Sequence, residues 1–408
     1  MPKLRFKNRY GQVFVDPEKL TIQDLFDKVK TINKDGANKN VITNSAEHGL
    51  IPQRKFFDKD IAVEGNTSKY TIIKDGDFVY NPRKSSIAPY GPFNCYIYEE
   101  PGIVSPLYSC LTPKSKAYTP YLLYYFESSA WYLYIYQNGN QGGARHDRVG
   151  MTDDLLQGIP VLLPCQEEQD KITAFLSLYD KRIAIQASKV KALEARRKGL
   201  LQQIFSQEIR FKADNGRNFP DWKDTILSDI LTERNLKSTG KEEVYSVSVA
   251  KRLVSQIEHL GRSFAAEDTS KYNVVKHGDV VYTKSPTGDF KWGIVKQSMI
   301  DKNAIVSPLY GVFIPRSYAF GFILDAYFSS SIRAHNYLIT QVDKGAKNTI
   351  NITNDVFLEK KIFLPTSEEE AQKIQSFVEL LDKQIQIEKD KLEAIKLVKK
   401  GLLQQMFV

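Results

Sequence analysis

Polar and basic side chains gather in short segments that follow β-type runs, and these residue types bind nucleic acids. In the first half of the chain they are Asn81, Arg83, Lys84 and Ser85, and then Gln141, Arg145, His146 and Arg148. In the second half they are Lys284, Ser285 and Lys291, and then Lys344, Lys347 and Asn348. Arg and Lys can bind guanine edges or phosphates, whereas Asn and Gln can pair with adenine. We therefore predict that these segments contact DNA.

The strongest candidates are Arg145 and Lys347, because both follow a Gly-Ala pair at matching places in the two halves. Each candidate could instead be an ordinary solvated charge, and the loop around Gly143 and Gly345 could be a structural turn. The aromatic run Trp131–Tyr136 is more typical of core packing than of base stacking.

No residue pattern indicates catalysis. The chain has no GxxxxGK[ST] phosphate loop, and its five histidines show neither HExxH nor paired spacing. His146 and Asp147 stand between Arg145 and Arg148, which favours a DNA-facing loop over a catalytic dyad. Three scattered cysteines form no metal-binding motif. We expect a chain without catalytic residues and without a bound metal.

Composition sets the broad class. The net charge of +9 and a pI of about 9.1 suit a polyanionic partner, although the excess is modest. The first residues lack the apolar core of a signal peptide, and no apolar run reaches the roughly 18 residues of a membrane span. We expect a cytoplasmic protein that does not enter a membrane.

The chain is a tandem repeat. The string IVSPLY at Ile103–Tyr108 recurs at Ile305–Tyr310, an offset of 202 residues. The two halves also end alike, with GLLQQIF at Gly199–Phe205 and GLLQQMF at Gly401–Phe407. Near the start of each copy the offset becomes 205, because LRFK at Leu4–Lys7 corresponds to IRFK at Ile209–Lys212. Two copies are too few for a solenoid, so we expect two similar globular domains, each followed by a helix.

Each globular part shows short strand-like runs, turn residues and a helical segment that begins near Pro120 in the first copy. This pattern predicts a mixed α/β (α+β) fold. We place the domain boundaries at 1–165 for the first globular domain, 166–206 for its helix, 207–365 for the second domain and 366–408 for the second helix.

A 4-3 alternation predicts that each helix has the seam of a coiled coil. In the first helix the d positions are Ile172, Tyr179, Gln186, Leu193 and Leu200, and the a positions are Leu176, Ile183, Val190, Arg197 and Ile204. In the second helix the d positions are Ile374, Leu381, Glu388, Ile395 and Leu402, and the a positions are Val378, Ile385, Leu392, Lys399 and Met406.

Four seam positions are polar, namely Gln186, Arg197, Glu388 and Lys399. A buried unpaired charge is costly, so these layers should face one another. A parallel pair would set Arg197 against Lys399, whereas one antiparallel register sets Arg197 against Glu388 and Gln186 against Lys399. We therefore predict an antiparallel coiled coil in that register. The alternative is that each helix packs on its own domain, with the charged ends reaching solvent.

The doubled layout resembles the specificity subunit of type I restriction-modification systems. The features that carry this resemblance are the repeated body, the run IPVLLP at Ile159–Pro164 followed by EEQDKI, and the helix that ends in GLLQQIF. The second copy departs slightly, with Glu370-Ala371-Gln372 in place of the usual Glu-Gln pair. The resemblance covers nearly the whole chain.

The resemblance implies that the two bodies are target recognition domains, each reading one half of a bipartite DNA site. It implies that the helices fix the spacing of the half-sites and dock two modification (methyltransferase) subunits, which restriction subunits join. It also implies that S-adenosylmethionine, ATP and Mg²⁺ are used by those partners, so that this chain holds no cofactor. Because the loops Asn81–Pro89 and Thr283–Lys291 differ completely, we expect an asymmetric site.

Two other hypotheses remain open. An enzyme of duplicated architecture would need a carboxylate, His or Cys cluster at matching positions, and only the turns Gly76-Asp77 and Gly278-Asp279 match, which are typical turn residues. A coiled-coil scaffold would assemble proteins without touching DNA. Steep salt dependence of duplex binding would distinguish a DNA-binding subunit from such a scaffold.

Overall fold

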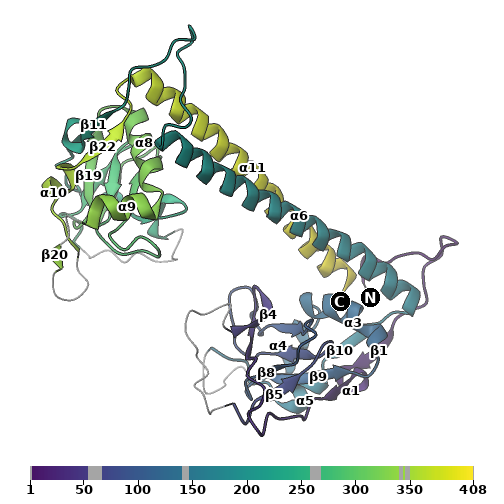
Figure 1. The fold of residues 1–408 in the computed structure, drawn as a ribbon. Coiled ribbons are helices and arrows are strands. Elements are labelled where there is room, and N and C mark those ends of the chain that lie inside the picture. Colours follow the sequence, from purple (N-terminus) through teal and green to yellow (C-terminus); the bar gives the residue numbers. More distant parts are fainter. Residues whose placement is uncertain are drawn as a thin grey trace. The chain divides into compact units, whose positions relative to one another are not determined.

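The protein is represented by a computed structural model that describes residues 2–53, 67–139, 147–257, 268–339, 343–344 and 350–407, with only the backbone at 343–344 and 350–351. The chain divides into two compact units, Met1–Ser188 with Lys389–Val408, and Lys189–Glu388. Each unit holds one globular part, here called head 1 (residues 2–165) or head 2 (residues 207–365), and segments of two long helices (Figure 1). No helix within the described ranges is long and apolar enough to cross a membrane.

Head 1 is built from short strands and helices around an aromatic core. Its main sheet has the order β2-β9-β6-β7, and smaller sheets pair β1 with β10, β3 with β4 and β5 with β8. The strands are β1 (Glu18–Thr21), β2 (Phe26–Lys28), β3 (Ile42–Ser45), β4 (Gly49–Pro52), β5 (Thr71–Ile73), β6 (Phe78–Tyr80), β7 (Phe93–Cys95), β8 (Gly102–Val104), β9 (Ser109–Pro113) and β10 (Pro160–Leu163). The helices are α1 (Ile22–Leu25), η1 (Lys116–Tyr118), α3 (Thr119–Glu127), α4 (Tyr132–Asn138) and α5 (Asp153–Gln157).

Head 2 has the same plan, with sheets ordered β12-β19-β16-β17 and β14-β13-β18-β15, and a pair of β11 with β22. The strands are β11 (Lys223–Ile226), β12 (Leu231–Glu233), β13 (Glu243–Ser248), β14 (Arg252–Ser255), β15 (Asn273–Val275), β16 (Val280–Tyr282), β17 (Val295–Gln297), β18 (Ala304–Val306), β19 (Gly311–Pro315), β20 (Asp343–Lys344), β21 (Ile350–Asn351) and β22 (Lys361–Leu364). The helices are η2 (Leu227–Asp229), α8 (Tyr318–Phe328), α9 (Ser331–Leu338) and α10 (Asn354–Leu358).

The strands of the two heads correspond at the offset read from the sequence. Strands β5, β6, β8 and β9 of head 1 map onto β15, β16, β18 and β19 of head 2 by adding 202 to each residue number. The central antiparallel pairing repeats as well, because Phe78 faces Leu111 in head 1 and Val280 faces Phe313 in head 2. The predicted mixed α/β fold and the tandem repeat are therefore confirmed.

Each head is tied to the start of the helix that follows it by an arginine near its beginning. Arg5 Nη2 lies 2.8 Å from a carboxylate oxygen of Glu168, which is 2 % exposed. Arg210 Nη2 lies 3.2 Å from the equivalent Glu370, which is 1 % exposed. Hydrogen bonding to Glu168 raises the pKa of Arg5, so the guanidinium group stays charged.

In unit 1 the first part of helix α6 (Gln166–Phe205) packs together with the last part of helix α11 (Glu368–Met406). Ile172 and Leu176 of α6 share the core of head 1 with Leu403 and Met406 of α11, and with Phe407 beyond its end. The Phe407 ring lies 5.3 Å from that of Tyr121, centroid to centroid. The core of head 1 is thus completed by residues from the end of the chain.

Unit 2 repeats this arrangement with the roles of the helices exchanged. Leu201 and Ile204, near the end of α6, share the core of head 2 with Ala371, Ile374 and Val378, near the start of α11. The helix segments run antiparallel, because Lys189 pairs with Glu388 at 3.0 Å while Arg197, further along α6, pairs with the earlier residue Asp382. The predicted antiparallel direction is confirmed.

The predicted register of the coiled coil is wrong by about one heptad. In unit 2, Arg197 binds Asp382 and not Glu388, whose ion pair is with Lys189. In unit 1, Lys399 binds Asp180 and Glu127, each at 2.6 Å, and not Gln186. A shift of one heptad still sets a positions opposite d positions, so the apolar pattern tolerates both registers. Carboxylates beside the seam then decide between them, because long basic side chains reach past the seam.

Candidate nucleic-acid interface

In head 1 the segment that follows strand β6 lies against the segment that precedes α5. The Lys84 N–H donates to the Asp147 carbonyl at 2.9 Å, and an isolated antiparallel bridge sets Arg83 opposite Arg148. Two of the predicted DNA contacts that are distant in sequence are thereby neighbours. Arg83 is exposed and Arg148 is half-buried.

These two arginines line a cleft of about 300 Å³ in head 1. Most of the other lining groups are polar, and the lining residues are Thr43, Asn44, Ser45, Asn81, Pro82, Arg83, Ser105, Leu107, Tyr108 and Arg148. Two guanidinium groups in one polar concavity suit a phosphate or the O6 and N7 edge of guanine, because each can donate two parallel hydrogen bonds.

The predicted contact Asn81 is committed to bonds within the protein. Its side chain is buried, donates to the Asn44 carbonyl at 3.0 Å and accepts from the Arg83 N–H at 3.0 Å. These bonds hold the backbone that carries Arg83, so Asn81 has a positioning role in this arrangement. Its contact with DNA stays a prediction.

Sequence reasoning missed Asn44, a lining residue that holds neighbouring parts of the cleft together. Its amide donates to the Val79 carbonyl at 2.7 Å and accepts from the Asn94 amide at 2.7 Å. Asn44 is 3 % exposed, and a buried amide must find such partners to avoid a desolvation cost. Asparagines inside the strand-like runs ITNS and FNC were the signal that could have found this network.

Ser85 and Gly91 close the loop after β6. The Ser85 hydroxyl accepts from the Ala88 N–H at 3.1 Å, which caps a tight turn. Gly91 has φ +85°, and a Cβ at this position would lie 2.1 Å from the Asn81 carbonyl oxygen. Only glycine allows both this backbone angle and this close approach. Ser85 itself is exposed, and its contact with DNA stays a prediction.

In head 2 the corresponding loop follows strand β16. Lys284 has φ +53° and is half-buried; burial lowers its pKa, and the nearby Glu233 carboxylate opposes that shift. Ser285 is half-buried and Lys291 is exposed. Gly293, the counterpart of Gly91, has φ +95°, and a Cβ there would meet the Lys284 nitrogen at 2.9 Å. This loop is therefore closed in the same way as that of head 1.

A tyrosine at the end of each central strand anchors the loop. The Tyr80 hydroxyl donates to the Tyr90 carbonyl at 2.7 Å, and the Tyr282 hydroxyl donates to the Trp292 carbonyl at 2.7 Å. The two loops thus differ in sequence but share one supporting frame.

Several predicted contacts lie outside the described residues. These are Gln141, Arg145 and His146 in the first half and Lys347 and Asn348 in the second. Lys344 lies in strand β20, where the side chain is not described. The aromatic run after residue 130 is divided, because Trp131 lies in the core of head 1 and Tyr136 is 62 % exposed.

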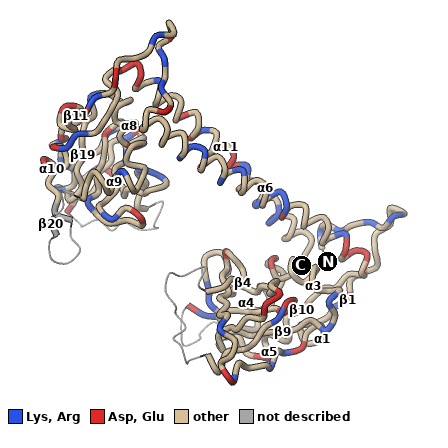
Figure 2. Tube along the Cα trace, viewed as in Figure 1, with Lys and Arg blue, Asp and Glu red and all other residues tan. Residues whose placement is uncertain are grey.

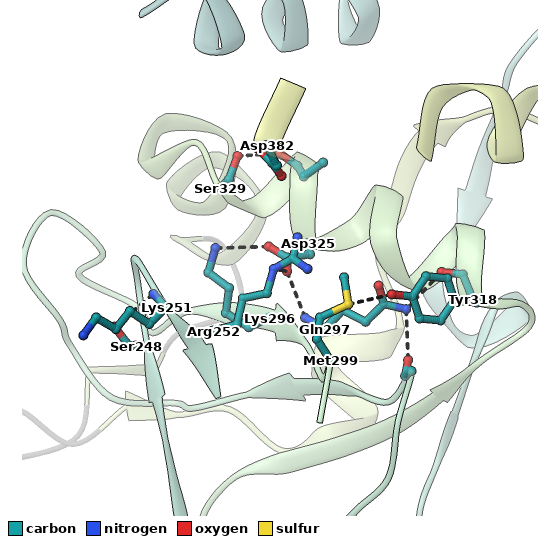
Figure 3. A network of polar contacts seen from close by, with 12 residues as sticks. Ser248, Lys251, Arg252, Lys296, Gln297, Met299, Tyr318, Asp325, Ser329 and Asp382 are labelled. Carbon is teal, nitrogen blue, oxygen red and sulfur yellow. Dashed lines mark hydrogen bonds and ion pairs between the residues drawn. The ribbon is translucent and has the colours of Figure 1, made fainter. Parts of the chain in front are cut away.

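Head 2 contains a buried charge cluster that sequence reasoning also missed (Figure 3). Asp325 on α8 accepts from Lys296 at 3.0 Å and lies 3.0 Å from Arg252 Nε. The Asp325 and Lys296 side chains are 4 % and 8 % exposed. The repeat places Asn94 and Leu123 where head 2 has Lys296 and Asp325, so head 1 has no counterpart of this pair. Because Lys296 and Arg252 share the single carboxylate of Asp325, the cluster ties α8 to β17 and β14.

Basic and acidic residues are interspersed along α6 and α11, and basic residues also mark both heads (Figure 2). Across the part of the chain that the structure describes, no group of three or more His, Cys, Asp or Glu side chains could hold a metal ion.

This chain is similar to known proteins both in sequence and in fold. Residues 221–397 match the family model described as the type I restriction modification DNA specificity domain. The whole chain also resembles a chain from a structure on complex assembly and conformational transition of the type I R-M system. That similarity has a TM-score of 0.55 and 13 % identity, and covers 96 % of this chain and 98 % of the other.

Two further solved structures are similar over nearly their full length. One is the S subunit of a type I restriction-modification system from M. genitalium, at 15 % identity, with 100 % and 99 % coverage and a TM-score of 0.47. The other is the HsdS subunit from Thermoanaerobacter tengcongensis, at 13 % identity, with 97 % coverage of each chain and a TM-score of 0.41. The domain match at residues 221–397 and the fold shared at a TM-score of 0.55 confirm the resemblance read from the doubled motifs.

Proposed function

Because this chain carries a type I restriction-modification DNA specificity domain at residues 221–397, we propose that it selects the DNA sequence on which such a complex acts. In this proposal head 1 and head 2 each read one half of a bipartite site. The observation that carries the proposal is that the two heads have the same arrangement of strands but unrelated loop sequences after the equivalent strands β6 and β16. A shared frame with different side chains suits two recognition surfaces that read different bases.

The loop residues of head 1 supply the chemistry for such reading. The exposed Arg83 and the half-buried Arg148 line one polar cleft, where they can bind guanine or grip the phosphate backbone. Lys284 and Lys291 in head 2 occupy the corresponding loop. Because these sets differ, the proposed site is asymmetric.

The helices carry a second repeated surface. Leu178 and Ile185 on α6 are 56 % and 70 % exposed, and their counterparts Leu380 and Ile387 on α11 are 67 % and 45 % exposed. Residues seven apart lie on the same side of a helix, so each pair forms an apolar stripe. We propose that each stripe docks one modification (methyltransferase) subunit, with α6 and α11 setting the half-site spacing. In the full complex, restriction subunits would join, and S-adenosylmethionine, ATP and Mg²⁺ would be bound by the partners.

The test is sequencing of methylated DNA from cells that carry this chain with its partner subunits. The expected result is an asymmetric bipartite motif that disappears when the gene is removed. Exchanging the loop Asn81–Pro89 for the sequence of Thr283–Lys291 should change one half of the motif and leave the other intact. A palindromic motif, or a motif that changes in both halves, would contradict the proposal.

A further inference from the structure

Leu107 and Leu309 stand at the tips of identical turns in the two heads. In head 1 the turn joins β8 to β9, with the Tyr108 N–H donating to the Ser105 carbonyl at 3.0 Å and the Leu107 N–H donating to the Ser105 hydroxyl at 3.3 Å. In head 2 the turn joins β18 to β19, and the two equivalent bonds to Ser307 are also 3.0 Å and 3.3 Å. Both leucines are therefore presented by the same rigid turn.

Folding accounts for the other residues of the repeated string IVSPLY. Ile103 and Val104 are fully buried, and Tyr108 packs against a small core cluster of head 1. The serine caps the turn, and proline presets the backbone angle of its first central position. The leucine is different, because Leu107 is 56 % exposed and Leu309 is 72 % exposed. An apolar side chain retained in both copies, but turned to solvent in both, points to a contact outside the chain.

The surroundings of Leu107 indicate what it contacts. Ser105, Leu107 and Tyr108 line the same cleft as Arg83 and Arg148. The two arginines can bind the phosphates on the outside of duplex DNA, and the exposed leucine can contact the apolar surface of the stacked bases.

We propose that Leu107 and Leu309 press against the duplex in the same way in each half-site, contacting sugars and the edge of the base stack without reading sequence. This inference rests on the proposed function. The two leucines would then form a contact with DNA that is common to both heads, beside the loops that differ. A residue that is identical in two heads cannot account for a difference in the bases that the heads read. Leucine is among the side chains that proteins insert against base steps.

The test compares Leu107→Ala, Leu309→Ala and the double variant within the assembled methyltransferase complex. The control is Leu133→Ala on α4, because Leu133 is also exposed, at 62 %, but does not line the cleft. Leu107→Ala and Leu309→Ala should each bind the cognate duplex about five-fold more weakly, in line with a lost contact of a few methyl groups. The double variant should lose roughly the product, and the methylated motif should stay unchanged. When 2-aminopurine replaces a base at successive positions of each half-site, the wild-type complex should change its fluorescence at one position per half. The leucine variant of the corresponding head should lose that change.

Each outcome bears on one claim. If the wild-type complex binds duplex DNA without sequence preference, the proposed function fails and this inference falls with it. If the wild-type complex binds its motif and Leu107→Ala binds equally well, only the inference fails. A methylated motif that changes in the leucine variants would show that the leucines read bases, and this would overturn the inference. The inference would also be overturned if the leucine variants lose the methyltransferase subunit while the complexes that still form bind DNA with unchanged affinity.

Discussion

Lys399 on α11 and Asp180 on α6 form an ion pair of 2.6 Å, and the same ammonium group binds Glu127 of head 1 at 2.6 Å. Adding 202 to Asp180 gives Asp382, which pairs with Arg197, and Arg197 is the counterpart of Lys399. The repeat therefore contains the same interhelical ion pair twice, once in each compact unit. In unit 1 this ion pair also connects a head to its helices.

Replacing Lys399 by Met should destabilise unit 1 by roughly 1–3 kcal/mol, because two carboxylates then face each other without their shared cation. Lys399 is only 8 % exposed, whereas Asp180 and Glu127 are each 45 % exposed and keep part of their hydration. Urea unfolding of the purified chain would give the change in free energy. The control is Lys396→Met, since Lys396 is 49 % exposed and pairs with Glu393 on its own helix. Equal stability of the two variants would argue against a structural role for the ion pair.

Phe407→Ala should destabilise head 1 and leave head 2 intact, although Phe407 lies at the far end of the sequence. The side chain is 4 % exposed and packs against Tyr121 and Tyr125, so its removal should cost about 3–5 kcal/mol. Hydrogen exchange would show lost protection in strand β10 and helix α3. Leu397→Ala should be nearly silent, because Leu397 is 70 % exposed. Lost protection confined to head 2 would refute this assignment.

Replacing Leu178 and Ile185 by Ser should remove one methyltransferase subunit from the complex and leave the chain folded, because both side chains are exposed. The matched variant, with Ser at Leu380 and Ile387, should remove the other copy. Native mass spectrometry of each complex would count the subunits. If both variants retain two methyltransferase copies, the stripes are not the docking surfaces, whatever the DNA specificity proves to be.

Cys165 should be the one cysteine alkylated in the folded chain at pH 8, because it is exposed while Cys95 and Cys110 are buried. Burial, with a smaller contribution from nearby aspartates, raises the pKa of both buried thiols to about 12. The unfolded thiols ionise near pH 8.5, so the stability that these two groups contribute is present below that pH and is lost progressively as the pH rises toward 12. Mass spectrometry after iodoacetamide treatment would test the labelling. Rapid modification of Cys110 without unfolding would contradict its buried placement.

The repeat, the long helices and their antiparallel direction followed from the sequence alone. Periodicity is a local property: apolar residues at 4-3 spacing define a helix face, and a constant offset of 202 residues defines two copies. The position of the two divergent loops at the ends of β6 and β16 could be read in the same way, because strand and turn residues alternate within a few positions.

The register of the helix pair and the framework of the cleft were decided by the tertiary structure. Seam periodicity is unchanged by a shift of one heptad, so it could not distinguish Glu388 from Asp382 as the partner of Arg197. Which polar groups are buried together is likewise a property of the packed chain. Asn81 and Asn44 are distant in sequence, and only folding brings them together and so determines that Asn81 supports the loop of Arg83.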